Sequence, residues 1–166
     1  MRALIKILIL SFLVVSTNIG MERSTYLTGA KLSSVEDIKQ VLFSGRSVRV
    51  VNFYSKCQGL NPVTGKERSG VDAVGGMIIE TFEYFGEDVF PDKPPYLAAS
   101  KAQMVYVGDR FYKDYVKMRF FENNRVEIIS MFLDPETNEI IPLHDFKCEV
   151  NSGNDSDGGV HAYVGP

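Results

Sequence analysis

The sequence predicts an α+β protein in which one N-terminal helix packs on a five- or six-stranded antiparallel meander sheet, with one disulfide bond. Apolar residues recur at helical spacing near the start of the chain, and β-branched and aromatic runs separated by short turns follow them. Strands joined by short turns pair antiparallel, because parallel partners need a long crossover. With 166 residues, 45% of them hydrophobic and 23% charged, the chain is long enough for one domain and too apolar to be disordered.

Residues 1–20 have the layout of a secretory signal peptide. Arg2 and Lys6 flank the start of an apolar run over residues 7–15, and small or polar residues follow it. A membrane anchor would need roughly 20 apolar residues, and this run is shorter. We therefore expect export with removal of residues 1–20, a single secreted domain over residues 21–166, and no stable insertion in a membrane. The expected location is extracellular, or periplasmic in a bacterium.

The predicted helix follows residue 33. Ser33 and Glu36 have the spacing of a capping box, in which a hydroxyl and a carboxylate satisfy the first free N–H groups of a helix. Gly45 suits the left-handed conformation that ends many helices. The apolar stripe between these two signals consists of Val35, Ile38, Val41 and Leu42.

The strands are expected after the helix, with turns rich in Gly, Asn, Asp and Pro between them. Residues 55–70 are polar and are expected to form a long loop, and residues 86–95 hold three prolines, which excludes a central strand. Residues 160–164 fit either a last short strand or a frayed terminus. The other expected strands cover residues 47–54, 74–85, 97–107, 111–121, 126–133 and 140–150.

The chain has two cysteines, Cys57 and Cys148. In an oxidising compartment an even number of cysteines predicts a disulfide bond. The alternative is a reactive Cys57 with His144 or His161 as its base, which needs a lowered thiol pKa and a positioned partner. The segment around Cys57 offers one neighbouring cation, Lys56, so we expect the disulfide.

The other chemical groups predict no catalytic, cofactor-binding or metal site, and we do not expect an enzyme. His144 and Asp145 are adjacent, so on a strand they point to opposite faces. His144 and His161 offer two imidazoles, whereas zinc needs three or four ligands. A hydrolase with His144 as its base is a remote alternative. The net charge of -3 gives no indication of a nucleic-acid partner.

Aromatic residues are frequent in the second half of the chain. They fit either a packed core or the lining of a ligand pocket. Alternation within residues 111–121 places Tyr112, Asp114, Val116, Met118 and Phe120 on one face, which we expect to be buried. The opposite face mixes aromatic and basic side chains and is expected to be the contact surface: Phe111, Lys113, Tyr115, Lys117, Arg119 and Phe121.

The order of these features resembles the VirK-like proteins, small exported proteins associated with bacterial virulence regions. The resemblance rests on a helix that ends in Leu42-Phe43-Ser44-Gly45, a strand that leads into Cys57, and Gly75-Gly76 at the start of a later strand. It also includes Phe146-Lys147-Cys148 and Gly158-Gly159 near the end of the chain. It implies an exported, β-rich domain of unassigned activity, with Cys57 and Cys148 as the matching functional positions.

Two functions agree with these observations. The first is a secreted, non-enzymatic factor, virulence- or effector-like, that acts through a protein-interaction surface on a partner outside the cell. The second is a carrier of a small apolar ligand in an aromatic-lined pocket. A cavity of several hundred Å³ would favour the carrier. An exposed strip of aromatic and basic side chains would favour the interaction protein.

Overall fold

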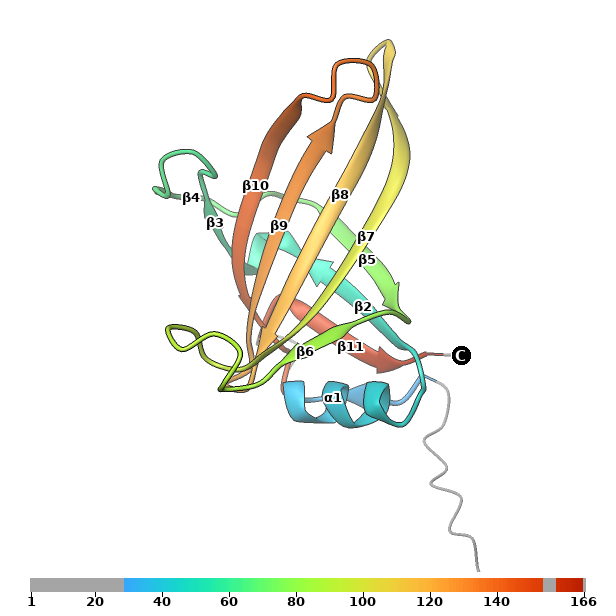
Figure 1. Cartoon of the computed structure of the whole chain (residues 1–166), viewed down its shortest axis with the longest axis vertical. Helices are drawn as coiled ribbons and strands as arrows, with labels where there is room; N and C mark the ends of the chain where they lie inside the picture. The colour runs from blue at the N-terminus through green and yellow to red at the C-terminus, as the bar shows by residue number, and fades with distance from the viewer. Residues whose placement is uncertain (1–28, 154–157, 166) are drawn as a thin grey trace, which may run out of the picture.

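The computed structural model describes residues 29–153 and 158–165 (Figure 1). The predicted signal peptide, residues 1–20, lies outside the described residues. In the described part the chain forms one α-helix, one short 3₁₀ helix and eleven strands. They are, in chain order, β1 (Lys31–Leu32), α1 (Val35–Phe43), β2 (Val48–Phe53), η1 (Tyr54–Lys56), β3 (Gln58–Leu60), β4 (Glu67–Arg68), β5 (Val74–Ile79), β6 (Glu83–Phe85), β7 (Tyr96–Val107), β8 (Arg110–Phe121), β9 (Arg125–Leu133), β10 (Ile140–Glu149) and β11 (Val160–Val164).

The described strands form two antiparallel sheets, which corrects the prediction of one sheet with five or six strands. One sheet has four strands in the order β1-β11-β2-β5, and the other has seven in the order β4-β3-β10-β9-β8-β7-β6. The predicted meander is present within the larger sheet, where β7, β8, β9 and β10 are consecutive neighbours. The helix is also not the first element described, because β1 precedes it.

The second sheet arises because the expected strand over residues 74–85 divides. β5 pairs with β2 in the four-stranded sheet, whereas β6 pairs with β7 in the seven-stranded sheet. The chain crosses between the sheets over residues 80–82. Two sheets form because the helix is too short to cover the apolar face of the long strands. A nine-residue helix is only about 13 Å long, whereas the strands have up to twelve residues. A second sheet covers part of that face.

The helix has the expected length, but its cap differs by one residue from the predicted capping box. The N-cap is Ser34, whose hydroxyl accepts a hydrogen bond from the backbone N–H of Asp37. The Asp37 carboxylate, and not that of Glu36, accepts a hydrogen bond from the backbone N–H of Ser33. The predicted helix end is confirmed, since Gly45 has a φ of 79° and its N–H donates to the carbonyl of Leu42.

A polar side chain joins the helix to the larger sheet. Asn124 occupies the turn between β8 and β9 with a φ of 64°, a conformation that asparagine tolerates. Its side-chain oxygen accepts a hydrogen bond from the backbone N–H of Val35 at 2.9 Å, and its carbonyl accepts one from Val150 at 3.0 Å. The start of the helix is thereby held against the ends of β8, β9 and β10.

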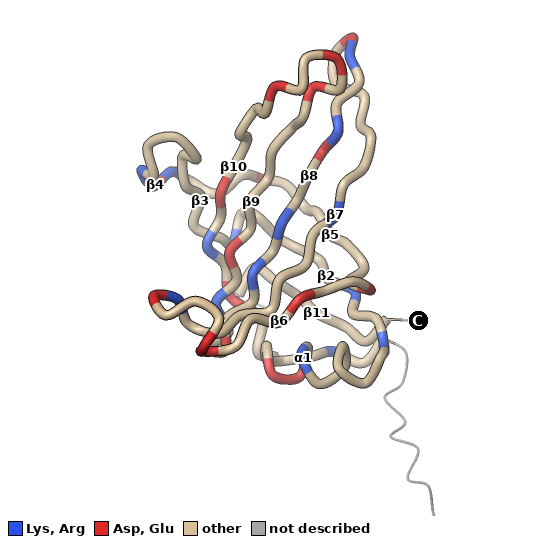
Figure 2. Tube along the Cα trace, in the orientation of Figure 1, with Lys and Arg blue, Asp and Glu red and all other residues tan. Residues whose placement is uncertain are grey.

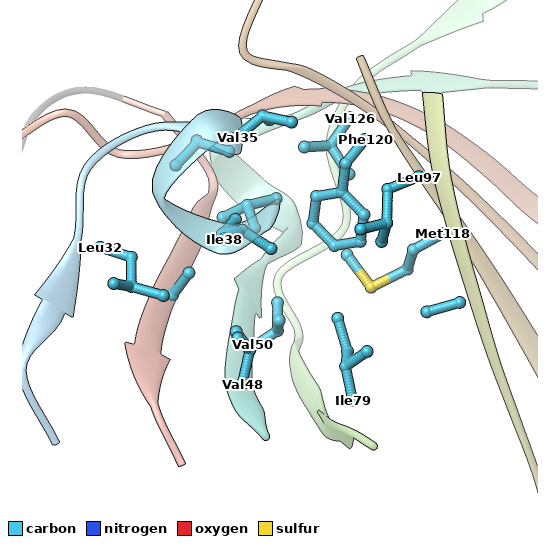
Figure 3. Close-up of a cluster of buried hydrophobic side chains, with 14 of the residues drawn as sticks. Leu32, Val35, Ile38, Val48, Val50, Ile79, Leu97, Met118, Phe120 and Val126 are labelled. Carbon is cyan, nitrogen blue, oxygen red and sulfur yellow. The ribbon is translucent and has the colours of Figure 1, made fainter. Parts of the chain in front are cut away.

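One hydrophobic core fills the space between the helix and both sheets (Figure 3). Ile38 of the helix points toward Phe120 of the larger sheet and toward Val50 of the smaller one. The predicted inward face of residues 111–121 is confirmed for Met118 and Phe120, which are buried. Phe121 of the opposite face is buried too, in a second cluster with Tyr96 and Ala98.

The polar segment 55–70 contains two short strands that its composition does not predict. β3 pairs with β10, and β4 pairs with β3. These strands have two or three residues, so no apolar alternation develops that could indicate them. Pairing with β10 is the interaction that holds them in place.

Residues 160–164 form a central strand, which resolves the two alternatives for this segment. β11 lies between β1 and β2 and is mostly buried. Gly159, just before it, lies against the disulfide, since a Cβ atom at this position would collide with the sulfur of Cys57 and approach the carbonyl of Phe53. The approach of β11 to β2 thus requires glycine at position 159.

The predicted disulfide bond between Cys57 and Cys148 is present and buried. Cys57 lies between η1, which follows β2 of the smaller sheet, and β3 of the larger sheet, whereas Cys148 lies in β10. Their Cα atoms are 4.6 Å apart, and 91 residues separate them in the sequence. The bond therefore attaches the point where the chain passes between the sheets to the end of β10 in the larger sheet.

Replacement of both cysteines by alanine is expected to lower the free energy of unfolding by about 4 kcal/mol, because the unfolded chain then loses a long covalent loop. Urea denaturation followed by fluorescence or circular dichroism measures this change. A reducing agent should destabilise the native chain and leave the double variant unaffected. Equal stability of the native chain with and without reductant would contradict the prediction.

Replacement of Gly159 by alanine is expected to cost about 2 kcal/mol, because the added methyl group overpacks the contact between β11 and the disulfide. Gly86→Ala is the matched control, since a Cβ atom there lies 3.9 Å from its nearest neighbour, a carbon of the Tyr84 ring. Thermal denaturation of the two variants compares them. A Gly159→Ala variant as stable as Gly86→Ala would show that the contact is relaxed easily.

Candidate functional site

The strands of the larger sheet extend beyond the smaller sheet at one end (Figure 1). Their side chains alternate between the face toward the core and the opposite face, here called the outer face. Cross-strand register places the outer-face residues of the projecting part in rows. These are Tyr106 and Phe111; Met104, Lys113 and Leu133; Ala102, Tyr115, Met131 and Pro142; and Ser100, Lys117, Ile129 and Asp145.

The outer face is apolar and basic where it projects. Met104 is 58% exposed and Phe111 is 62% exposed, and the rings of Tyr106 and Phe111 contact each other at 4.9 Å. Lys and Arg residues lie along β8 (Figure 2). Within the described residues, Lys113 and Lys117 form no ion pair, whereas Arg119 pairs with Glu127 at 3.5 Å. The aromatic and basic strip expected from the sequence is thus exposed at the projecting end of β8, where Phe111 and Lys113 lie.

At its other end the outer face is covered by the chain itself. Phe85 of β6 and Phe90 of the following loop contact Tyr96, at 4.9 and 6.3 Å between ring centroids. Arg125 lies over the ring of Phe121 at 4.4 Å. The contact surface expected over residues 111–121 therefore does not include Phe121, because β6 and the loop after it bury this end.

The projecting part of β7 is a free sheet edge. β6 pairs with β7 only from Tyr96 to Ala98. Beyond Ala98, β7 pairs with β8 alone within the described residues. A free edge presents unpaired backbone N–H and C=O groups, to which another extended chain can add. Lys101 is the one charged side chain between Ala98 and Val107, so little charge protects this edge.

A hollow of about 220 Å³ lies where β6 leaves the edge. Its lining includes the small side chains of Ala98 and Ser100 together with Tyr115 and Lys117. Glu83 of β6 also lines it. The small side chains of Ala98 and Ser100 on β7 therefore leave space beside Lys117 of β8.

His144 does not meet a carboxylate in the described part of the molecule. It pairs in register with Ser130, its ring lies 5.6 Å from that of Phe146, and its buried Nδ1 atom has no hydrogen-bond partner among the described residues. Asp145 points to the other face, where burial raises the pKa of its carboxyl group. The geometry gives the hydrolase alternative no support.

The two histidines also lie in different sheets. His161 of β11 contacts the Asn151 side chain at 3.2 Å and the ring of Phe53 at 4.8 Å. Among residues 29–153 and 158–165, no group of three or more His, Cys, Asp or Glu side chains could hold a metal ion. In the same ranges no helix is long and apolar enough to cross a bilayer.

A second hollow, of about 110 Å³, lies between the two sheets. Its lining includes the polar side chains of Asn52, Lys101 and Asp114. It is smaller than usual ligand pockets and polar, so it does not favour the apolar-ligand carrier. Most of the aromatic residues instead contact one another in the core or across strands. This agrees with a role in packing, the first of the two roles expected for them.

The fold and the surface together define a small, disulfide-bonded protein of two β-sheets with a projecting, partly apolar sheet. A family model described as VirK protein matches residues 31–138. The chain therefore belongs to the VirK family, as its resemblance indicated.

The structural comparison agrees with this assignment. The fold is similar to that in the crystal structure of lpg1832, a VirK family protein from Legionella pneumophila, with a TM-score of 0.60 and 14% sequence identity over 80% of this chain and 98% of that chain. At this identity the likeness shows a shared fold. No curated protein matches the sequence of the chain.

Sequence reasoning missed the free edge of β7, the hollow beside Lys117 and the hollow between the sheets. All three depend on where neighbouring strands end, and strand ends are the least regular feature of an apolar pattern. The one available signal for the third was Asn52, a polar residue at an inward position of a strand whose other inward residues, Val48 and Val50, are β-branched.

Proposed function

We propose that this protein is an exported, non-enzymatic factor, virulence- or effector-like, that binds an extended segment of a partner protein outside the cell. The observation that supports the proposal best is the free edge of β7 next to an exposed, apolar and basic outer face. An added strand would continue the line of β6 along β7 and would bury Met104 and Tyr106. It would also satisfy backbone groups that otherwise face water.

The charges indicate the character of the partner segment. Lys113 and Lys117 lie on β8, one strand away from the edge. The small side chain of Ser100 lies opposite Lys117 and leaves it accessible from the edge, and Lys113 is exposed beside Met104. Glu83 lines the hollow beside Lys117 and would repel a carboxylate of the partner there. A partner carboxylate therefore fits better further along β7, toward Lys113. We therefore propose an extended segment in which apolar residues alternate with Asp or Glu.

Selection from a phage-displayed library of random peptides tests this proposal. Peptides that bind the full exported protein should be rich in alternating apolar and acidic residues and poor in proline, since proline cannot donate to a sheet. Lys113→Glu should weaken their binding about tenfold, because it replaces an attraction by a repulsion. Lys66→Glu is the matched control, since Lys66 is equally exposed and lies in the β3–β4 loop.

Hydrogen exchange distinguishes edge addition from other binding modes. The bound peptide should slow exchange at backbone amides of β7 between Lys101 and Val107. Equal binding by the Lys113→Glu and Lys66→Glu variants, or protection confined to the smaller sheet, would rule out the outer face as the contact surface.

Export is tested separately. When the full sequence is expressed in a cell with a functional secretion system, intact-mass analysis of the exported protein should show the loss of about 20 N-terminal residues. The same spectrum should show a mass two hydrogens lower than that of the reduced chain. A cell-retained protein that still carries Met1 would contradict the assignment of a signal peptide.

A further inference from the structure

The hollow between the sheets lies where β2 and β5 of the smaller sheet face β7 and β8 of the larger one. Asn52, Tyr54 and Gly75 contribute from the side of the smaller sheet. Lys101, Gln103 and Asp114 contribute from the larger sheet. This is the end of the shared core, from which the long strands continue without cover.

Asn52 is a buried polar group with an unfilled hydrogen-bonding position. Its side chain is on the inward face of β2, where Val48 and Val50 precede it, and it is 1% exposed. The amide nitrogen contacts the sulfur of Met118 at 3.8 Å, which is a weak acceptor. The Oδ1 atom has no hydrogen-bond partner among the described residues. The Oδ1 atom is therefore available to accept a hydrogen bond from a ligand.

Two opposite charges line the same small hollow without neutralising each other. Asp114 accepts a hydrogen bond from the Gln103 side chain at 3.3 Å, and cross-strand register pairs these two residues. Lys101 lies two residues before Gln103, on the same face of β7. Among the ion pairs of the described residues, none includes Lys101 or Asp114. The hollow therefore offers one cation and one anion to a ligand.

Tyr54 and Gly75 shape the wall opposite these charges. Burial raises the pKa of the Tyr54 hydroxyl, a hydrogen bond from the Asn52 side chain opposes the increase, and the charge of Asp114 adds to it. The hydroxyl therefore keeps its proton and can donate. A Cβ atom at Gly75 would lie 2.8 Å from the Tyr54 oxygen, so glycine allows the Tyr54 side chain to pack against β5.

We propose that the hollow binds a small amino-acid zwitterion, with its ammonium group at Asn52 and Asp114 and its carboxylate at Lys101. A zwitterion satisfies both charges and donates to the Asn52 oxygen, which a simple anion does not. The hollow of about 110 Å³ is small for a ligand pocket, which favours the smallest amino acids. This site is separate from the outer face and does not depend on the proposed partner.

Calorimetric titration of the full, disulfide-bonded protein tests the proposal with glycine, L-alanine, L-tryptophan, methylammonium, acetate and acetamide. Glycine or L-alanine should bind, and each of the other probes should bind at least about tenfold more weakly. The single-charge probes lose one charged contact, acetamide loses both, and L-tryptophan is too large. Acetate, methylammonium or acetamide binding as well as glycine would overturn the assignment, and so would the absence of binding by every amino acid.

Variants separate the site from the rest of the protein. Lys101→Met, at an exposed position, should weaken glycine binding about tenfold, whereas Lys113→Met on the outer face should leave it unchanged. Asn52→Leu should also abolish binding while it retains or raises the melting temperature, since it removes an unpaired buried oxygen. Equal affinities for the two lysine variants would overturn the proposal even if Asn52→Leu failed to fold.

Discussion

The attachment of the crossing chain to β10 is the constraint on which the arrangement of the two sheets depends. After β2 the chain leaves the smaller sheet, passes through η1 and enters the larger sheet at β3, and Cys57 lies in this passage. The bond to Cys148 holds the passage against the larger sheet. Gly159 and the start of β11 then pack on the same sulfur, so both layers meet at this point.

The unequal size of the sheets determines where the molecule can bind other molecules. The smaller sheet and the helix cover only one end of the long strands, and the buried residues of β7 and β8 are at that end. The other end keeps its hydrogen bonds within β7–β10 but buries little side-chain area. A long antiparallel sheet of this kind can therefore remain folded while it exposes apolar side chains and a free edge.

The hollow with Asn52 lies at the boundary between the covered and the uncovered parts of the larger sheet. On one side the residues of the inner face are apolar, as Met118 and Phe120 show, and on the other they are Gln103 and Asp114. Such a boundary combines a low dielectric environment with access from solvent, which strengthens the interactions of a charged ligand. Polar atoms there cost stability, which favours a functional explanation for their presence.

The helix, its end at Gly45 and the pairing of the two cysteines could be predicted from the sequence. They follow from the apolar stripe, positive φ and cysteine number, which act over a few residues or through composition. The assignment of β5 and β6 to different sheets, the strands β3 and β4 and the central place of β11 were evident only in the folded molecule. Strand pairing joins residues distant in sequence, and a three-residue strand has no periodicity of its own. The binding surfaces depend on where those pairings stop.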